Sequence, residues 1–449
     1  MLRLKKNTNM RIGIIVSRIG GEDGVALETE KWAEVLKEMG HEVFIASGRF
    51  EKDILVNRKY HKRIKNLSFG YNINEKQRSK VFEVLDTAFR NPKIILSKIR
   101  LESEIISRKL ARWINENNLK LLILENTNSL PVHLPLARAI KDIIEKTGIN
   151  AISHNHDFHW ERGKDYVSPY QEINSLVKEL FPLQLPKVKH VVINSAAKKK
   201  LKKDFGIKAV YIPNVMNFSK PFGKKTEKNK NLAKELGLKD DDIPIFQVTR
   251  IIRRKNIETS IKLIKKLDDE KVKLIITGSA DDDPGKTYYR EIRELIKLLG
   301  LEKQILFAGD KFFKGGFLLK YLYFKNLFKY KYREYNHSDA YSAATACVFF
   351  SRYEGFGNAF IEAVAAKKPI FVNNYEPVFW QDIGKKGFKV VMLEKENLTQ
   401  EAVNKIKKII YDRSLAREIA NFNFELGKKL FSYKVLKKKL SRILGELEI

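Results

Sequence analysis

The sequence predicts an α/β protein made of two doubly wound domains, each with a parallel sheet between layers of helices. Short β-branched runs recur along the chain, and amphipathic stretches of helical length separate most of them. This rhythm is typical of parallel sheets. The chain has 449 residues, of which 43% are hydrophobic and 31% charged, which suits two cores of ordinary size and excludes intrinsic disorder.

The runs that are expected to form strands fall into two groups, one in each half of the chain. Those of the first half are Arg11–Val16, His41–Ala46, Leu121–Glu125, Ala151–Ser153, His190–Asn194 and Val210–Ile212. Those of the second half are Pro244–Thr249, Lys273–Thr277, Gln304–Ala308, Cys347–Ser351 and Pro369–Asn373. Each group is sufficient for one open sheet.

A polar, lysine-rich segment over residues 216–242 separates the two groups and contains only one short helical stretch. We therefore expect a first domain at residues 1–215, a linker at 216–242 and a second domain at 243–425. Residues 426–449 are expected to form a helix that returns to the first domain. Because open α/β sheets bind ligands outside the carboxyl ends of their strands, a cleft between the domains is the expected active site.

The chain is strongly basic, with 86 Lys and Arg against 54 Asp and Glu, a net charge of +32. Such a charge attracts anions, which include nucleic acid, acidic lipid and small phosphorylated or carboxylated molecules. The sequence contains no zinc-finger spacing, RNP-like string or basic heptad array. A nucleic-acid-binding protein is therefore the least favoured function, and no specific nucleic-acid partner is expected.

The single cysteine, Cys347, lies in the apolar run Ala346–Phe350 and cannot form an intramolecular disulfide. A buried thiol in a reducing compartment is the expected state. No run of 18 apolar residues occurs, and the run Ile12–Val16 is too short for a secretion signal. We expect a cytoplasmic protein that is at most peripheral to a membrane, and the sequence predicts no oligomeric state.

The segment from Ser351 to Val364 carries the strongest binding signal. Its two glycines allow a tight loop with exposed backbone amides, and Asn358 is expected to cap a helix over Ala359–Ala366. Amide groups at a helix start form an anion site. Glu354 lies on the loop and Glu362 within the helix, and carboxylates suit the recognition of vicinal hydroxyls. The segment therefore predicts a site for a phosphate and a diol.

A second basic segment directly follows the first strand of the second half. Four cations occur there within six residues: Arg250, Arg253, Arg254 and Lys255. Arg250 and Lys255 could converge on a diphosphate, the arginine as a fork and the lysine as a point charge. A basic surface turn is the alternative.

Together these two segments resemble the family-four retaining glycosyltransferases of the GT-B fold. That family carries an Arg and a Lys five residues apart after the first strand of the second domain, and an E-G-F-G segment with a second Glu eight positions after the first. Arg250, Lys255, Glu354 and Glu362 match. Further family-like pieces follow in the expected order: Gly20-Gly21, Gly40–Val43, Ile212–Asn214, Gly278, Phe307–Gly309 and Ser338–Ala340.

The resemblance implies two Rossmann-like domains and transfer of a hexose from a GDP- or UDP-linked sugar to an acceptor hydroxyl, with retention at the anomeric carbon. In that family the Arg and Lys bind the donor diphosphate, the first Glu contacts the donor sugar, and the second usually holds the ribose. Further donor contacts are then expected from Gly20, Gly21, Gly278, Gly355, Phe356, Gly357 and Asn358. No cofactor is expected beyond this co-substrate, and the charge favours a small acidic acceptor.

A histidine just after a first-domain strand also contacts the sugar in that family, and residues 152–162 contain three histidines. His154, closest to the strand end, is the expected one, with His156 as the alternative. His156, Asp157 and Arg162 are candidates for acceptor contacts. A metal held by His154, His156 and Asp157 is a further alternative, but the family needs none for leaving-group stabilisation and none is expected. The sequence His-x-His-Asp-Phe-x-Trp-Glu-Arg at residues 154–162 also resembles that of a subgroup that includes mannosylglucosylglycerate synthases.

The stretch from Lys311 to Tyr335 is longer than the usual family connection and is crowded with Phe, Tyr and Lys. If it is helical, one face carries Phe317, Tyr321, Phe324, Phe328 and Tyr332. We expect a flap packed on the second domain, and a peripheral membrane contact that serves a lipid-linked acceptor is the alternative. The other enzyme activity left open is that of a nucleotide-sugar epimerase.

Overall fold

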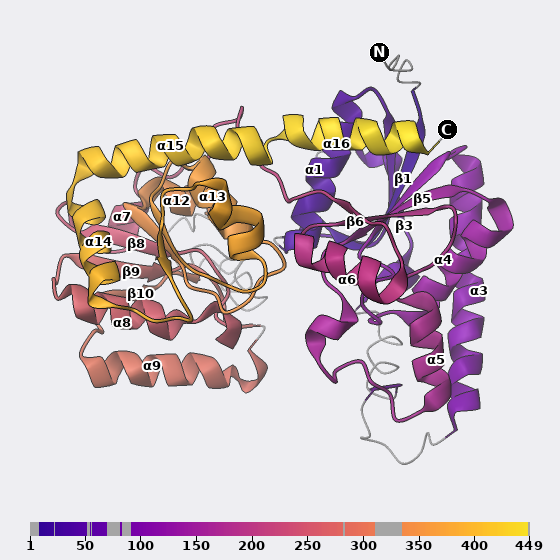
Figure 1. Cartoon of the computed structure of the whole chain (residues 1–449), viewed down its shortest axis with the longest axis horizontal. Coiled ribbons are helices and arrows are strands. Elements are labelled where there is room, and N and C mark those ends of the chain that lie inside the picture. The colour runs from indigo at the N-terminus through magenta and orange to yellow at the C-terminus, as the bar shows by residue number, and fades with distance from the viewer. Residues whose placement is uncertain are drawn as a thin grey trace, which may run out of the picture. The chain divides into compact units, whose positions relative to one another are not determined.

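The computed structural model describes residues 9–21, 23–51, 54, 56–69, 81–82, 91–281, 283–309 and 335–447. The chain divides into two compact units (Figure 1). Unit 1 is Met1–Val215 with Tyr433–Ile449, and unit 2 is Met216–Ser432. Each unit has its own sheet and its own core.

Unit 1 contains a parallel sheet with the strand order β3-β2-β1-β4-β5-β6-β7. The strands are β1 (Arg11–Ile19), β2 (Glu42–Phe50), β3 (His61–Arg63), β4 (Leu121–Glu125), β5 (Asn150–Asn155), β6 (Val188–Val192) and β7 (Val210–Tyr211). The direction in which strands are added reverses between β1 and β4. Such a switch point is where open α/β sheets bind ligands.

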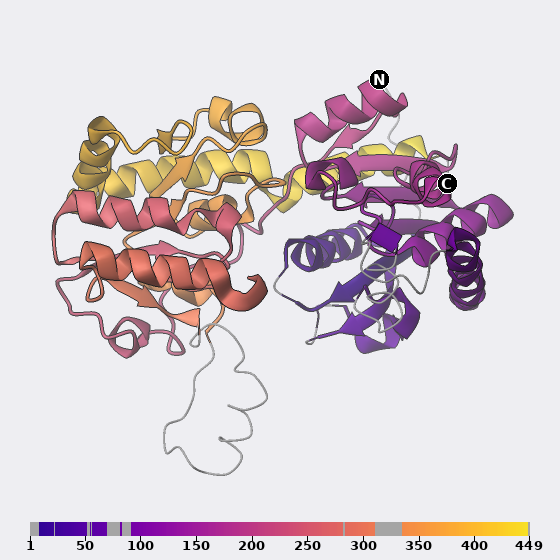
Figure 2. The ribbon, with the colours of Figure 1, turned by 90° about the horizontal axis from the view of Figure 1, so that it is seen from below.

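Helices cover both faces of this sheet (Figures 1 and 2). They are α1 (Gly24–Glu38), α3 (Pro92–Glu116), α4 (Leu134–Thr147), α5 (Gln171–Leu180), α6 (Ser195–Phe205) and α16 (Tyr433–Glu446). Alternate residues of β1 pack on opposite sides: Ile14 joins a core with α1 and α16, and Ile15 joins one with α3 and α4. This alternation follows from the two-residue period of a strand.

Unit 2 repeats the pattern with the parallel order β10-β9-β8-β11-β12-β13, so the switch point lies between β8 and β11. The strands are β8 (Ile243–Gln247), β9 (Val272–Ile276), β10 (Ile305–Phe307), β11 (Ala346–Phe349), β12 (Ile370–Asn373) and β13 (Val391–Leu393). The helices are α7 (Leu232–Glu235), α8 (Ile257–Leu267), α9 (Thr287–Leu299), α12 (His337–Ala343), α13 (Asn358–Ala365), α14 (Gln400–Tyr411) and α15 (Arg413–Phe431). A π-helical turn covers Phe379–Ile383.

The α/β class and the two doubly wound sheets agree with the prediction, and every expected run overlaps an observed strand. The sequence analysis missed β3 and β13, which are short strands at sheet edges. Residues 216–242, expected as a linker, belong to unit 2. The final helix begins at Tyr433 rather than at residue 426, because α15 continues to Phe431.

The stretch Lys311–Tyr335, for which a flap or a membrane contact was expected, lies outside the described residues except for Tyr335. Among the helices of the described segments, none combines the length and apolar character that a membrane span requires.

Candidate functional site

In unit 2 the two predicted donor segments meet around one carboxylate. Lys255 closes a short 3₁₀ turn after β8, and Glu354 lies on the loop after β11. The Lys255 ammonium donates to Glu354 Oε1, and Arg254 Nη1 lies 2.7 Å from Glu354 Oε2. The side chains of Lys255 and Glu354 are both only 10% exposed. Glu354 is therefore a largely buried anion between two cations.

This arrangement shifts the titration of both partners. Burial lowers the pKa of Lys255 to about 8, although the charge of Glu354 acts in the opposite direction. Burial alone would raise the pKa of Glu354, but Lys255 and Arg254 outweigh it and lower that pKa to about 2. Below pH 8 the cluster carries two positive charges for one negative charge, and it can attract an anion.

Arg352, which the sequence analysis did not single out, joins the two loops. Its backbone N–H donates to Arg254 O at 2.8 Å, and its guanidinium donates to Arg253 O at 2.8 Å. The same guanidinium binds the carboxylates of Glu258, at 2.6 Å, and Glu396, at 3.0 Å. Arg352 thus fixes the spacing between the basic turn and the loop that carries Glu354.

Two of the predicted glycines are required by close backbone packing. A Cβ atom on Gly278 would lie 1.9 Å from Thr249 O, directly behind the turn that carries Arg250. Gly357 has φ +118°, and a Cβ there would lie 2.2 Å from Tyr375 Oη. Both positions exclude any side chain because the neighbouring atoms cannot move far.

The expected cap of the following helix is wrong by one position. Helix α13 begins at Asn358 itself, Gly357 occupies the N-cap position, and no side chain caps the helix. Gly357, whose backbone is left-handed, takes the N-cap position for which Asn358 was predicted. The neighbouring Gly355 is half-buried, and Phe356 is buried and accepts a 2.7 Å hydrogen bond from Tyr375 through its carbonyl.

Two further predicted donor residues of unit 2, Glu362 and Arg250, differ in burial, and the charge of Arg250 also acts to lower the pKa of Lys255. Glu362 is buried on α13 and accepts a 3.0 Å hydrogen bond from Tyr341 Oη. Arg250 is exposed on the loop after β8. This places Glu362 within the helix, as the spacing predicted, and Arg250 at an exposed position of the loop.

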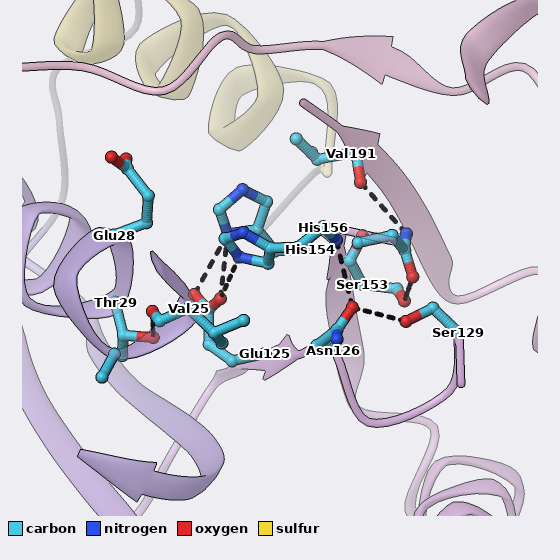
Figure 3. Close-up of polar contacts among 12 residues, drawn as sticks. Val25, Glu28, Thr29, Glu125, Asn126, Ser129, Ser153, His154, His156 and Val191 are labelled. Carbon is cyan, nitrogen blue, oxygen red and sulfur yellow. Dashed lines mark hydrogen bonds and ion pairs between the residues drawn. The ribbon is translucent and has the colours of Figure 1, made fainter. Parts of the chain in front are cut away.

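In unit 1 two histidines converge on a carboxylate that the sequence analysis missed. Glu125 is the last residue of β4, and it pairs in register with His154 of β5. His154 Nδ1 lies 3.0 Å from Glu125 Oε2, and His156 Nε2 lies 3.2 Å from the same oxygen (Figure 3). All three residues are buried. The available signal was a lone carboxylate at the carboxyl end of a predicted strand.

The three groups titrate unequally. Burial alone would raise the pKa of Glu125, but His154 and His156 lower it to about 2. Burial lowers the pKa of His154 and outweighs the effect of Glu125. Burial also acts to lower the pKa of His156, but Glu125, Glu28 and Asp157 together raise it. The cluster therefore contains a carboxylate with two chemically different imidazoles.

The surroundings hold this cluster in place. The indole of Trp32 stacks on His154 with ring centroids 4.0 Å apart. Asn126 accepts a 3.1 Å hydrogen bond from the backbone N–H of His156 and donates one of 2.8 Å to Asp157. Asp157 also pairs with Arg162, so these two predicted acceptor residues bind each other.

The predicted glycines of unit 1 shape the loop after β1. Gly20 has φ +82°, and a Cβ on Gly21 would lie 2.9 Å from Glu51 Oε2. The loop ends at Asp23, which caps α1 by accepting from the N–H groups of Val25 and Ala26. The left-handed backbone of Gly20 is therefore the stricter requirement of this loop, because a Cβ on Gly21 would meet only the end of the Glu51 side chain.

One group of described side chains has a composition that could hold a metal ion. The ligand atoms of Glu125, His154 and His156 all lie within 4.8 Å of one another. Asp157, which the sequence analysis placed in the alternative metal set, is bound to Asn126 and Arg162 instead. The hydrogen bonds from both imidazoles already satisfy the Glu125 carboxylate.

Comparison with known proteins identifies the family. A family described as "Glycosyl transferases group 1" matches residues 228–312 and 318–425. The mannosylglucosylglycerate synthase of Thermotoga maritima is 31% identical over 462 residues, which cover 96% of this chain and 99% of that enzyme. The chain is a group 1 glycosyltransferase.

A second curated relative agrees with this assignment, and solved structures show the fold. The mannosylglucosylglycerate synthase of Petrotoga mobilis is 28% identical to this glycosyltransferase over 453 residues, covering 96% of this chain and 100% of the relative. Sucrose-phosphate synthase of Thermosynechococcus elongatus superposes with a TM-score of 0.65 at 16% identity, covering 98% and 99% of the two chains. Anabaena HepE, solved with UDP and glucose, superposes with a TM-score of 0.63 at 13% identity, covering 98% of this chain and 100% of that chain. The fold is GT-B.

Proposed function

We propose that this glycosyltransferase moves a hexose from a GDP- or UDP-linked sugar to a hydroxyl of a small acidic acceptor, with retention at the anomeric carbon. The observation that carries the proposal is the buried cluster of Lys255, Arg254 and Glu354 in unit 2. It lies on the carboxyl side of two strands that flank the switch point. We assign the nucleotide to unit 2 and the acceptor to unit 1.

The chemistry follows from charge development at the leaving group. Departure of a nucleoside diphosphate leaves negative charge on its phosphate oxygens, and preorganised cations stabilise that charge. Lys255 and the exposed Arg250 supply these cations in our proposal. Glu354 orients Lys255 and contacts the sugar, and Glu362 binds the ribose. This division needs no metal at the diphosphate.

The acidic acceptor is supported by two observations. The protein has a net charge of +32, which raises the local concentration of anions. Its relatives from Thermotoga and Petrotoga are named for a product that contains a glycerate unit, which is a carboxylate. We place His156 and Arg162 near the acceptor and the reaction in the cytoplasm.

The test is mass spectrometry of products from a panel of UDP- and GDP-hexoses, each incubated with and without small sugar acids. We expect one donor to yield a product heavier than a sugar acid by one hexose unit, and NMR of that product to show the donor's anomeric configuration. An isomerised donor without acceptor would indicate an epimerase instead. Transfer only to lipid-linked acceptors would refute the small acidic acceptor.

A further inference from the structure

We propose that Glu125 is the positioning residue of unit 1: it accepts hydrogen bonds from both imidazoles and fixes His154 with its proton on Nδ1 and its lone pair on Nε2. The proposal concerns how the candidate histidine is prepared for the reaction, and its role in transfer rests on the proposed function.

The first step is the backbone geometry that brings the groups together. Glu125 and His154 are register partners on the neighbouring parallel strands β4 and β5, and β4 borders the switch point. His156 follows two residues after His154 and returns to the same carboxylate (Figure 3). Sheet ends hold side chains more precisely than free loops do. The meeting of the three groups is therefore a property of the sheet.

The second step is the direction of the two hydrogen bonds. A carboxylate with a pKa of about 2 is ionised in the neutral range and can only accept. Each imidazole must then donate to Glu125, His154 from Nδ1 and His156 from Nε2. A neutral imidazole that donates from Nδ1 keeps its lone pair on Nε2. Glu125 thus selects one of the two tautomers of His154.

The third step concerns which histidine carries a positive charge. The charged groups around the pair are Glu28 and Lys31 on α1, Glu125 on β4 and Asp157 after β5. Lys31 pairs with Glu28 at 2.6 Å, and the carboxylate of Glu28 is buried. Burial favours neutral His154, which lies under Trp32, and the anions favour a proton on His156. Glu125 is shared by one neutral ring and one that gains a proton more readily.

In the proposed transfer, Nε2 of His154 accepts a hydrogen bond from a hydroxyl of the donor sugar, while His156, which gains a proton more readily, attracts the acidic acceptor. Both roles depend on Glu125, because without its charge either tautomer of His154 becomes accessible and His156 loses its ion-pair partner. We expect Glu125→Gln to lower kcat by about 10²-fold, the lower end of what positioned acid–base groups contribute.

The pH profile separates positioning from a merely structural effect. Protonation of His154 at Nε2 abolishes its acceptor role, so activity should fall on the acidic side. Removing the Glu125 charge lowers the pKa of both histidines. The acidic limb of the kcat–pH profile, where activity falls as the pH decreases, should therefore move to lower pH in Glu125→Gln. Glu125→Asp keeps the charge and should keep the limb in place. Glu102→Gln, at a buried carboxylate on α3 outside the cluster, should change neither kcat nor the limb.

A second readout does not depend on activity. The chain has eight histidines, and ¹⁵N NMR of the imidazoles of the full-length protein reports each tautomer, with His154→Gln used to assign the signal. We expect the Nδ1–H form of His154 in the wild type and a mixture in Glu125→Gln. An Nε2–H form in the wild type, or a Glu125→Gln variant with unchanged tautomer and limb, would overturn the proposal. A wild type that transfers no sugar but shows the expected tautomers would refute only the proposed function.

Discussion

The buried amine of Lys255 makes nucleotide affinity depend on pH in a range where an ordinary lysine stays charged. Its pKa is lowered to about 8 by burial, and only the ammonium form attracts a diphosphate. Well below pH 8 the lysine is protonated in the free protein, so the affinity for a nucleoside diphosphate should be nearly constant. Above pH 8 the Lys255 amine must take up a proton before it can attract the diphosphate, and the affinity should therefore fall.

The size of the effect follows from linkage. Each pH unit above the pKa costs about tenfold in affinity, or ~1.4 kcal/mol. With a pKa of about 8, the apparent Kd should weaken roughly 30-fold between pH 7 and pH 9.5 if the neutral amine contributes nothing. An exposed lysine with a pKa near 10.4 would give a change of less than about 1.2-fold over the same range.

The assay is calorimetry with bare UDP and GDP from pH 7 to 9.5. Lys255→Gln removes the titrating group. The variant should bind the nucleotide more weakly at pH 7, and its affinity should lack the fall above pH 8 that Lys255 causes. Any slope that remains in this variant belongs to the nucleotide or to other groups and is subtracted. If wild type and Lys255→Gln give parallel profiles, Lys255 does not titrate in this range. If the two profiles also coincide, Lys255 does not bind the diphosphate, and the donor-site assignment fails.

Three further substitutions test other parts of the site in unit 2. Arg250→Ala should lower kcat by about 10²- to 10³-fold through loss of a charge donor, while the melting temperature stays unchanged because Arg250 is exposed. Glu362→Gln should weaken the binding of the bare nucleotide by about tenfold, corresponding to loss of one charge-assisted hydrogen bond. An unchanged calorimetric Kd would exclude a ribose contact. Gly278→Ala should lower both melting temperature and nucleotide affinity, because the new Cβ meets Thr249 O at 1.9 Å, whereas Gly445→Ala enters open space and should spare nucleotide affinity.

The sequence predicted those features that depend on local patterns. Apolar runs of strand length and amphipathic intervals specify alternating strands and helices regardless of distant contacts. Lys255 and Glu354 were predicted as part of one site because each belongs to a short motif with fixed spacing. Edge strands such as β3 escaped prediction, since three polar residues carry no hydrophobic period.

The contacts that hold the site together escaped prediction for a different reason. Arg352 reaches Arg253 O across 99 positions of sequence, and Glu125 reaches His154 across 29. No local pattern encodes a partner at such a distance, because the partner is determined by strand order and register. The identity of the residue, a carboxylate or a guanidinium, is visible in the sequence, but its role is not.

Strand order nevertheless supplies a rule that would have found Glu125. In each unit the direction of strand addition reverses once, between β1 and β4 in unit 1 and between β8 and β11 in unit 2. In unit 2, Lys255 follows β8 and Glu354 follows β11, so the donor candidates come from both strands that flank the switch. In unit 1, Glu125 ends β4 and the two histidines come from the end of β5, next to it. Polar residues at the carboxyl ends of switch-point strands face the position where open sheets bind ligands. A lone carboxylate that ends an otherwise apolar strand at this position is therefore a functional candidate even when no motif surrounds it.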